Sequence, residues 1–152
     1  MKLVTFRNQL NTDVGILKNE YVISLSAINE WFCLVNKKNT KYKNILLSME
    51  EIIKNSDSAL PYIEKLVEYY INGNITGDKR AKDATFSFNE LEILAPLDRP
   101  EKIICVGLNY LDHCIETGME APISPVIFSK FTNAIIGNCQ AIELPINSQE
   151  VD

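Results

Sequence analysis

A pair of prolines, Pro96 and Pro100, constrains this chain more than any other feature of its sequence. Proline fixes its own φ angle and biases the preceding residue toward extended backbone, so the segment between the two prolines is expected to be a stiff linker. Apolar residues at both strand and helix spacing precede it, and mainly strand-like runs follow it. We therefore predict an α+β fold, with a small mixed α/β domain in residues 1–95 and the start of a strand-rich domain in residues 96–152.

Short apolar runs predict strands on both sides of this linker. In the first domain they occupy residues 2–6, 14–17, 21–23, 85–88 and 91–95, with a hairpin turn at 18–20. In the second domain they occupy residues 102–106, 125–128, 133–136 and 141–144. The run at 102–106 is continuously apolar, which is typical of a strand that is buried on both faces.

Helices are indicated by capping residues. Ser26 is the expected N-cap of a helix that runs to about residue 35, and Ser48 with Glu51 forms a capping-box pattern. Pro61 is expected in the first turn of a longer helix that stops at Gly73. In the second domain, residues 109–117 have helical potential, with a glycine at position 118 as the stop.

The formal net charge of −5 lies entirely in the second domain. Residues 1–95 carry 12 basic and 12 acidic residues, whereas residues 96–152 carry 3 basic and 8 acidic ones, so 3 − 8 = −5. The missing basic stripe argues against a nucleic-acid partner. An acidic surface in water is the common interpretation of the charged end, and a bound cation is the alternative.

The chain shows no sign of a membrane or secretory protein. Its longest apolar runs are too short to cross a bilayer, and the first residues lack a signal or transit pattern. The four cysteines form no C-x-x-C pair, which favours reduced thiols over a zinc site. We expect no membrane partner and a cytoplasmic location, with a mitochondrial one also compatible.

The single histidine of the chain, His113, is the clearest candidate for acid–base chemistry. A helix would place it and Glu116 at i and i+3, close enough to contact each other. A neighbouring carboxylate makes an imidazole more basic and fixes its tautomer, so the pair can take a proton from water. On spacing alone, an ordinary structural role for His113 is the commoner outcome.

The wider sequence around His113 resembles the start of the catalytic domain of the fumarylacetoacetate hydrolase family. The resemblance lies in Arg99–Tyr110, Asp112-His113, Glu116, Pro125–Phe131, Ile136-Gly137, Leu144-Pro145 and Ser148–Asp152, all in the family's order. Residues 1–95 resemble, more loosely, the small N-terminal domain of two-domain members.

This resemblance implies a metal-dependent enzyme that acts on small β-dicarbonyl or 2-oxo acid substrates, by acylpyruvate or fumarylacetoacetate hydrolysis or by oxaloacetate decarboxylation. It also implies a homodimer and a divalent ion, Mg²⁺, Mn²⁺ or Ca²⁺.

The resemblance assigns roles to individual residues. His113, oriented by Glu116, would activate the attacking water. Lys130, Asn109 and Tyr110 would contact the substrate, and the segment around the histidine would form a lid. The alternatives are that Lys130 is an ordinary solvated lysine and that Asn109 and Tyr110 only fix the turn after the preceding strand, which Gly107 would permit.

The metal ligands of the family are expected outside residues 1–152. Two glutamates separated by one residue, with a downstream aspartate, hold the metal, and the spacing from Leu144-Pro145 places that pair beyond the position of Asp152. Glu150 and Asp152 are an acidic pair upstream of it, and we do not assign them as ligands. The chain is thus expected to be truncated before the metal site. The alternative is a catalytically inactive homologue that acts only as a structural or interaction module.

Overall fold

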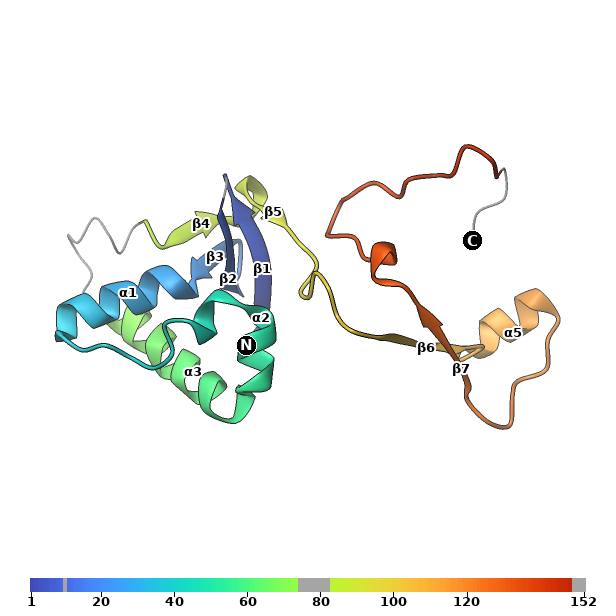
Figure 1. Ribbon diagram of the computed structural model, residues 1–152, viewed down its shortest axis with the longest axis horizontal. Coiled ribbons are helices and arrows are strands. Elements are labelled where there is room, and N and C mark those ends of the chain that lie inside the picture. The colour runs from blue at the N-terminus through green and yellow to red at the C-terminus, as the bar shows by residue number, and fades with distance from the viewer. Residues whose placement is uncertain (10, 74–82, 149–152) are drawn as a thin grey trace. The chain divides into compact units, whose positions relative to one another are not determined.

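The computed structural model describes residues 1–9, 11–73 and 83–148 (Figure 1). It contains two compact units: the N-terminal unit, Met1–Leu97 with Ile136–Asp152, and the ribbon unit, Asp98–Ile135. The predicted domain boundary between residues 95 and 96 stays a prediction, because the N-terminal unit also takes in residues from the end of the chain. No described helix has the length and apolar character needed to cross a membrane.

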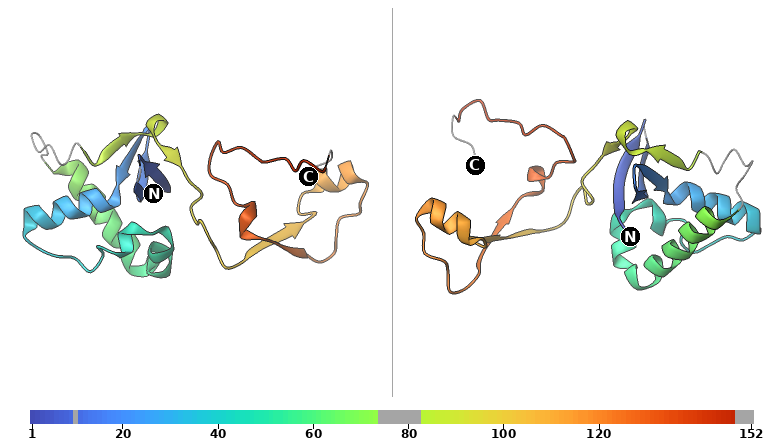
Figure 2. Two further views of the ribbon diagram at one scale, coloured as in Figure 1. Left: turned by 45° about the horizontal axis from the view of Figure 1, so that its top comes forward. Right: turned by 180° about the vertical axis from the view of Figure 1, so that it is seen from behind.

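The N-terminal unit is an antiparallel sheet with helices gathered on one side (Figures 1 and 2). The sheet has five strands in the order β4-β3-β2-β1-β5. Its strands are β1 (Leu3–Asn8), β2 (Asn11–Lys18), β3 (Tyr21–Ser24), β4 (Thr85–Ser87) and β5 (Glu92–Ile93). Its helices are α1 (Leu25–Asn36), α2 (Met49–Lys54) and α3 (Ser56–Asn72), with short 3-10 turns η1 (Ile45–Leu47) and η2 (Phe88–Glu90).

The start of α1 differs from the prediction, because Ser24 and not Ser26 is its N-cap. The Ser24 hydroxyl accepts a hydrogen bond from the Ala27 backbone N–H at 3.1 Å. The Ser26 hydroxyl instead donates to Asp13 Oδ2 at 2.6 Å. A hydroxyl satisfies the free N–H groups of a first helical turn only from the residue that precedes the turn, which is Ser24 here.

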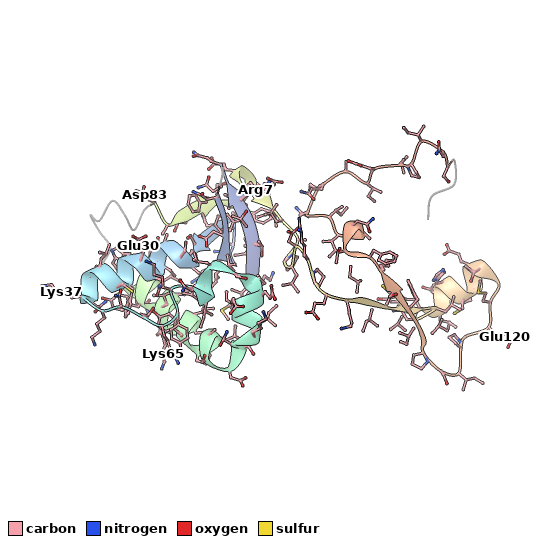
Figure 3. All side chains as sticks on the ribbon, in the orientation of Figure 1. Arg7, Glu30, Lys37, Lys65, Asp83 and Glu120 are labelled. Carbon is pink, nitrogen blue, oxygen red and sulfur yellow. The ribbon has the colours of Figure 1, made fainter. Side chains whose placement is uncertain are left out.

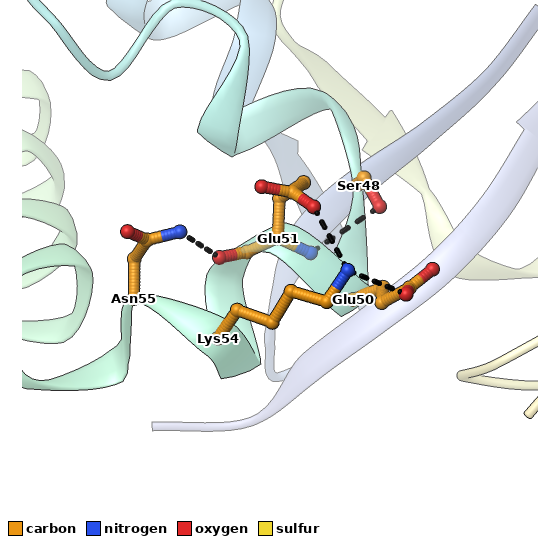
Figure 4. A network of polar contacts seen from close by, with 5 residues as sticks. All are labelled: Ser48, Glu50, Glu51, Lys54 and Asn55. Atoms are coloured by element: carbon orange, nitrogen blue, oxygen red, sulfur yellow. Dashed lines mark hydrogen bonds and ion pairs between the residues drawn. The ribbon is translucent and has the colours of Figure 1, made fainter.

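The capping box of α2 is confirmed (Figure 4). The Ser48 hydroxyl accepts from the Glu51 N–H at 3.4 Å. At the other end of the helix, Lys54 Nζ lies 2.7 Å from Glu50 and 3.3 Å from Glu51. The hydrogen bonds to Glu50 and then to Glu51 raise the pKa of Lys54 above its ordinary value.

Helix α3 begins one turn earlier than predicted. The backbone carbonyl of Asn55 accepts the N–H groups of Ser58 and Ala59 at 3.0 and 2.8 Å, so the helix grows directly out of the end of α2. Pro61 therefore lies inside α3 and not in its first turn. Gly73 ends the helix as predicted, and its N–H donates to the Tyr69 carbonyl.

The two faces of the sheet are filled differently. The helices cover one face and form the main core with it, whose buried members are Val14, Ile16, Ile23, Leu25, Ile28, Leu46, Met49, Ile52, Ala59, Ile63, Leu66 and Ala84. On the other face Phe6 and Val22 close over Gly15. A Cβ atom built on Gly15 would lie 2.5 Å from Val22 Cγ1 and 2.9 Å from Phe6 Cε1, so this position accepts only glycine without rearrangement.

The segment that follows the ribbon unit contacts β5 at Asn138 and Gln140. The N–H of Asn138 donates to the Ile93 carbonyl at 3.1 Å, and Gln140 Nε2 donates to Glu92 Oε1 at 3.3 Å. The strand predicted at 141–144 is wrong, since the structure has no strand in this stretch. A strand requires a continuous ladder of backbone hydrogen bonds with a neighbouring strand. In the described segment after the ribbon unit, only Asn138 donates its backbone N–H to β5.

The ribbon unit has two antiparallel strands, β6 (Ile103–Gly107) and β7 (Val126–Lys130), which are joined through helix α5 (Leu111–Thr117). The strand predicted at 133–136 is wrong, because a 3-10 turn, η3 (Thr132–Ala134), stands there. The predicted burial of β6 is also wrong, since Ile104 is 68% exposed. β7 pairs with only one edge of β6, and the described residues of this unit provide no layer to cover either face.

Candidate functional site

Helix α5 carries the predicted catalytic pair, and its ends are set by two residues with left-handed backbone. Leu108 (φ 49°) turns the chain out of β6, and Gly118 (φ 65°) ends the helix, as the sequence predicted. Gly107 was expected to permit the first turn, but it lies within β6 and the left-handed residue is Leu108. Leucine seldom adopts this conformation, so no residue type at this position indicates the turn.

Cys114 fixes α5 to the turn that precedes it. It is 2% exposed and is the only buried residue among those described in the ribbon unit. Its thiol donates to the Leu108 carbonyl at 3.8 Å. The N-cap Tyr110 adds no side-chain hydrogen bond, so α5 depends on this buried contact and on its backbone.

His113 and Glu116 lie on the exposed surface of α5. They stand at i and i+3, as predicted, which puts them on neighbouring positions of one helix. Among the described residues no hydrogen bond or ion pair joins them. The backbone carbonyl of His113 accepts a hydrogen bond from the Thr117 hydroxyl at 2.7 Å. The imidazole is therefore open to solvent and to a ligand.

The three predicted substrate contacts do not all lie near this pair. Asn109 and Tyr110 are exposed and lead directly into α5. Lys130 lies opposite Ile103 in the β6–β7 register, at the end of the ribbon away from Gly107, from which α5 departs. Four residues of strand separate these ends by about 13 Å. The role of Lys130 therefore stays a prediction.

The described residues do not form a metal site. Nowhere in residues 1–9, 11–73 and 83–148 do three or more His, Cys, Asp or Glu side chains gather closely enough to hold an ion. Glu150 and Asp152 lie outside the described residues. The residues present thus do not fit the divalent ion that the resemblance implies, and we derive no chemical step through it.

Similar proteins are found for the region that contains this site. Residues 102–152 match the family model for the fumarylacetoacetate (FAA) hydrolase C-terminal region. A Xenopus laevis protein named mitochondrial oxaloacetate tautomerase fahd2 is 48% identical over 66 residues, which are 43% of this chain and 21% of the relative. The Bos taurus protein FAHD2A, of the same description, is 53% identical over 64 residues, 42% of this chain and 20% of the relative. The matched segment thus spans about a fifth of the length of these relatives.

The fold also has a solved counterpart. The crystal structure of an HpcE protein from Mycobacterium smegmatis superposes with a TM-score of 0.58 and covers 96% of this chain and 41% of its own. At 20% identity this likeness concerns the fold alone, and it confirms the predicted α+β class. The match over residues 102–152 makes this region of the chain similar to the fumarylacetoacetate hydrolase family, as the sequence predicted.

Proposed function

We propose that this chain supplies the catalytic base of an enzyme that acts on a small β-dicarbonyl or 2-oxo acid substrate, and that His113 is this base. The observation that carries the proposal is that the single histidine lies exposed on a short helix inside the segment that matches the family. An exposed imidazole at this position can reach a ligand without any rearrangement of the core.

The names of the relatives indicate which reactions this chain could take part in. A tautomerase of oxaloacetate removes a proton from the carbon beside a carbonyl group and delivers a proton to the carbonyl oxygen. A hydrolase of the same substrate class takes a proton from water. Both reactions need one base of moderate strength, and histidine is the side chain best suited to this at neutral pH.

The remaining roles come from the resemblance to the family. We propose that Glu116 orients the His113 ring, that Asn109 and Tyr110 hold the substrate beside α5, and that Lys130 binds a substrate carboxylate. The whole protein would be a homodimer that uses Mg²⁺, Mn²⁺ or Ca²⁺ held by residues outside those described, and it would be mitochondrial like the relatives named above.

The test compares variants of α5 in the assay of one substrate at a time. The 152-residue chain is incubated with oxaloacetate or acetylpyruvate, with and without Mg²⁺, and enol formation or cleavage is followed by ultraviolet absorbance. Loss of a general base lowers the rate by about 10²–10⁴-fold, so His113→Gln should do so. Glu116→Gln should give a smaller loss, and Asp112→Asn, a carboxylate on the same helix, is the matched control without effect.

A rate that His113→Gln leaves unchanged would refute the base assignment. The second candidate function is a non-catalytic structural or interaction module, and the exposed apolar ribbon favours it. Absence of turnover, together with no heat of Mg²⁺ or Mn²⁺ binding in calorimetry, would support the module over the enzyme for this chain.

A further inference from the structure

We infer that the N-terminal unit carries a binding pocket for a small oxyanion, a carboxylate or a phosphate, at the loop that follows α1. None of its residues belongs to the proposed His113 site. The pocket has a volume of about 500 Å³ and is lined by residues along α1, by the loop after it and by Leu47 of η1. This volume is in the range of small-molecule sites.

The floor of the pocket holds a buried amide with a free donor. Asn29 lines the pocket and is only 3% exposed. Its Oδ1 accepts from the Tyr62 hydroxyl at 2.7 Å and from the Thr40 hydroxyl at 3.2 Å. Its Nδ2 has no hydrogen-bond partner among the described residues. Every fully enclosed polar side-chain atom of these residues does have a hydrogen-bond partner, so this nitrogen is not fully enclosed and is open to the pocket. A fixed N–H donor there suits an acceptor ligand.

The rim of the pocket is positively charged. Lys37, Lys38 and Lys43 line it, with Glu30 as the one acidic side chain. No carboxylate in the described part of the chain forms an ion pair with any of the three lysines. Figure 3 shows Lys37 at the free end of α1 and Glu30 further back on the same helix. Three ammonium groups against one carboxylate leave the pocket cationic in a chain of net charge −5.

The C-terminal carbonyls of α1 would normally disfavour an anion at this place. Here several of them already accept hydrogen bonds. The carbonyls of Cys33 and Leu34 accept the backbone N–H groups of Lys38 and Lys37, and Asn36 Nδ2 donates to the Phe32 carbonyl at 2.9 Å. Lys37 adopts left-handed backbone (φ 50°) to make this cap. The cap therefore reduces the repulsion that these carbonyls would exert on a bound oxyanion and turns the lysine loop over the same end of the helix.

The combination of one fixed amide donor and several mobile ammonium groups defines the ligand. Charged hydrogen bonds from lysine to an oxyanion are about twice as strong as neutral ones, and the amide adds direction. A pocket of this size with a single cationic loop suits a small organic anion, and a polymer backbone would need an extended basic stripe. A dicarboxylate and a phosphate share this chemistry, and the experiment separates them.

The test is a titration of the 152-residue chain with malonate and with inorganic phosphate, each followed by ¹H–¹⁵N NMR, with sodium chloride at matched ionic strength as the control. We expect saturable shifts at the Asn29 side-chain NH₂ and at the Thr40 amide with one of the two anions, and none with chloride. The tighter of the two anions identifies the ligand class.

Variants locate the site. Lys38→Gln with Lys43→Gln should weaken binding at least tenfold, whereas Lys65→Gln, an exposed lysine of α3 outside the pocket, should leave it unchanged. The substituted lysines are exposed, so folding is preserved and circular dichroism checks this. Shifts that merely follow ionic strength, no shifts at all, or equal binding by the double variant would each overturn the proposal.

Discussion

The two units of this chain treat the same kind of side chain in opposite ways. In the N-terminal unit Ile63 is fully buried between α3 and the sheet, whereas Ile104 on β6 of the ribbon unit is 68% exposed. Most of the apolar side chains of β6 and β7 share this exposure, including Phe128 and Ile127. The first unit thus contains its own core, and the second has the sequence of a core without the layers that would enclose it.

This difference has a physical origin in the number of layers. A sheet covered by helices buries one face of each strand, while a two-stranded ribbon is marginally stable by itself. Apolar patches of this kind in folded proteins mark surfaces that contact another part of a protein. The ribbon unit therefore has the character of an interface element, and the following substitutions measure how far the two units differ.

The largest effect is expected from matched isoleucine truncations. Ile63→Ala should lower the free energy of unfolding by about 3 kcal/mol, because it opens a cavity in a packed core. Ile104→Ala should change it by less than about 0.5 kcal/mol, as for other exposed positions. Urea denaturation followed by circular dichroism gives both values. A loss of 2 kcal/mol or so for Ile104→Ala would show that the ribbon is covered in solution, and the contrast between the units would fail.

Matched glycine substitutions give the next effect. Gly15→Ala should destabilise the N-terminal unit by about 1–3 kcal/mol, because the new methyl group would overlap Val22 and the backbone carbonyl of Ile23. Gly107→Ala meets its nearest atom at 3.6 Å, an ordinary contact, and should be near neutral. Thermal denaturation compares the two. Equal melting temperatures for both variants would mean that β1, β2 and β3 relax around position 15.

The first helix of the N-terminal unit has a side-chain N-cap, and the helix of the ribbon unit has none. Ser24 caps α1 through its side chain, whereas Tyr110 at the start of α5 makes no such bond. Ser24→Ala should therefore cost about 1 kcal/mol. Tyr110→Ala should cost no measurable stability, and chemical denaturation of both variants provides the check. A clear loss for Tyr110→Ala would reveal a contact that holds α5 in solution.

The sequence predicted the N-terminal unit well because its signals are local. Alternating apolar residues, the Ser48 capping box and Gly73 act within a few residues, and the structure has strands and helices where they indicate them. The errors occurred where a neighbour decides the outcome. The helix starts directly after β3, so Ser24 and not Ser26 precedes its first turn, and the stretch 141–144 forms no strand.

For the candidate site, the sequence predicted the helix but not the side-chain contacts. The similarity of residues 102–152 to the family followed from motifs in order, and the helix that carries His113 followed from its helical potential; both are found. The contact of His113 with Glu116 stays a prediction, because side-chain rotamers on an exposed helix are not fixed by sequence spacing. No sequence motif indicated the pocket lined by Asn29 and the lysines after α1. The pocket depends on Asn29 lying beneath a loop that begins eight residues later in the chain.

The smallest expected effect concerns a tyrosine in each unit. Tyr62 is half-buried, donates to Asn29 and stacks on Tyr42, and burial raises its pKa above the ordinary value. The folded state therefore keeps the Tyr62 proton to higher pH than the unfolded state. This contribution to stability is complete below about pH 10 and is lost as the pH rises toward the folded pKa.

Tyr62→Phe should cost about 0.5–1 kcal/mol at neutral pH, through the lost hydrogen bond, and should flatten the alkaline decline in melting temperature. Tyr110→Phe, on the exposed start of α5, should change neither. An alkaline decline that Tyr62→Phe leaves as steep as before would place its origin in another group and would remove Tyr62 from the contrast between the buried and the exposed unit.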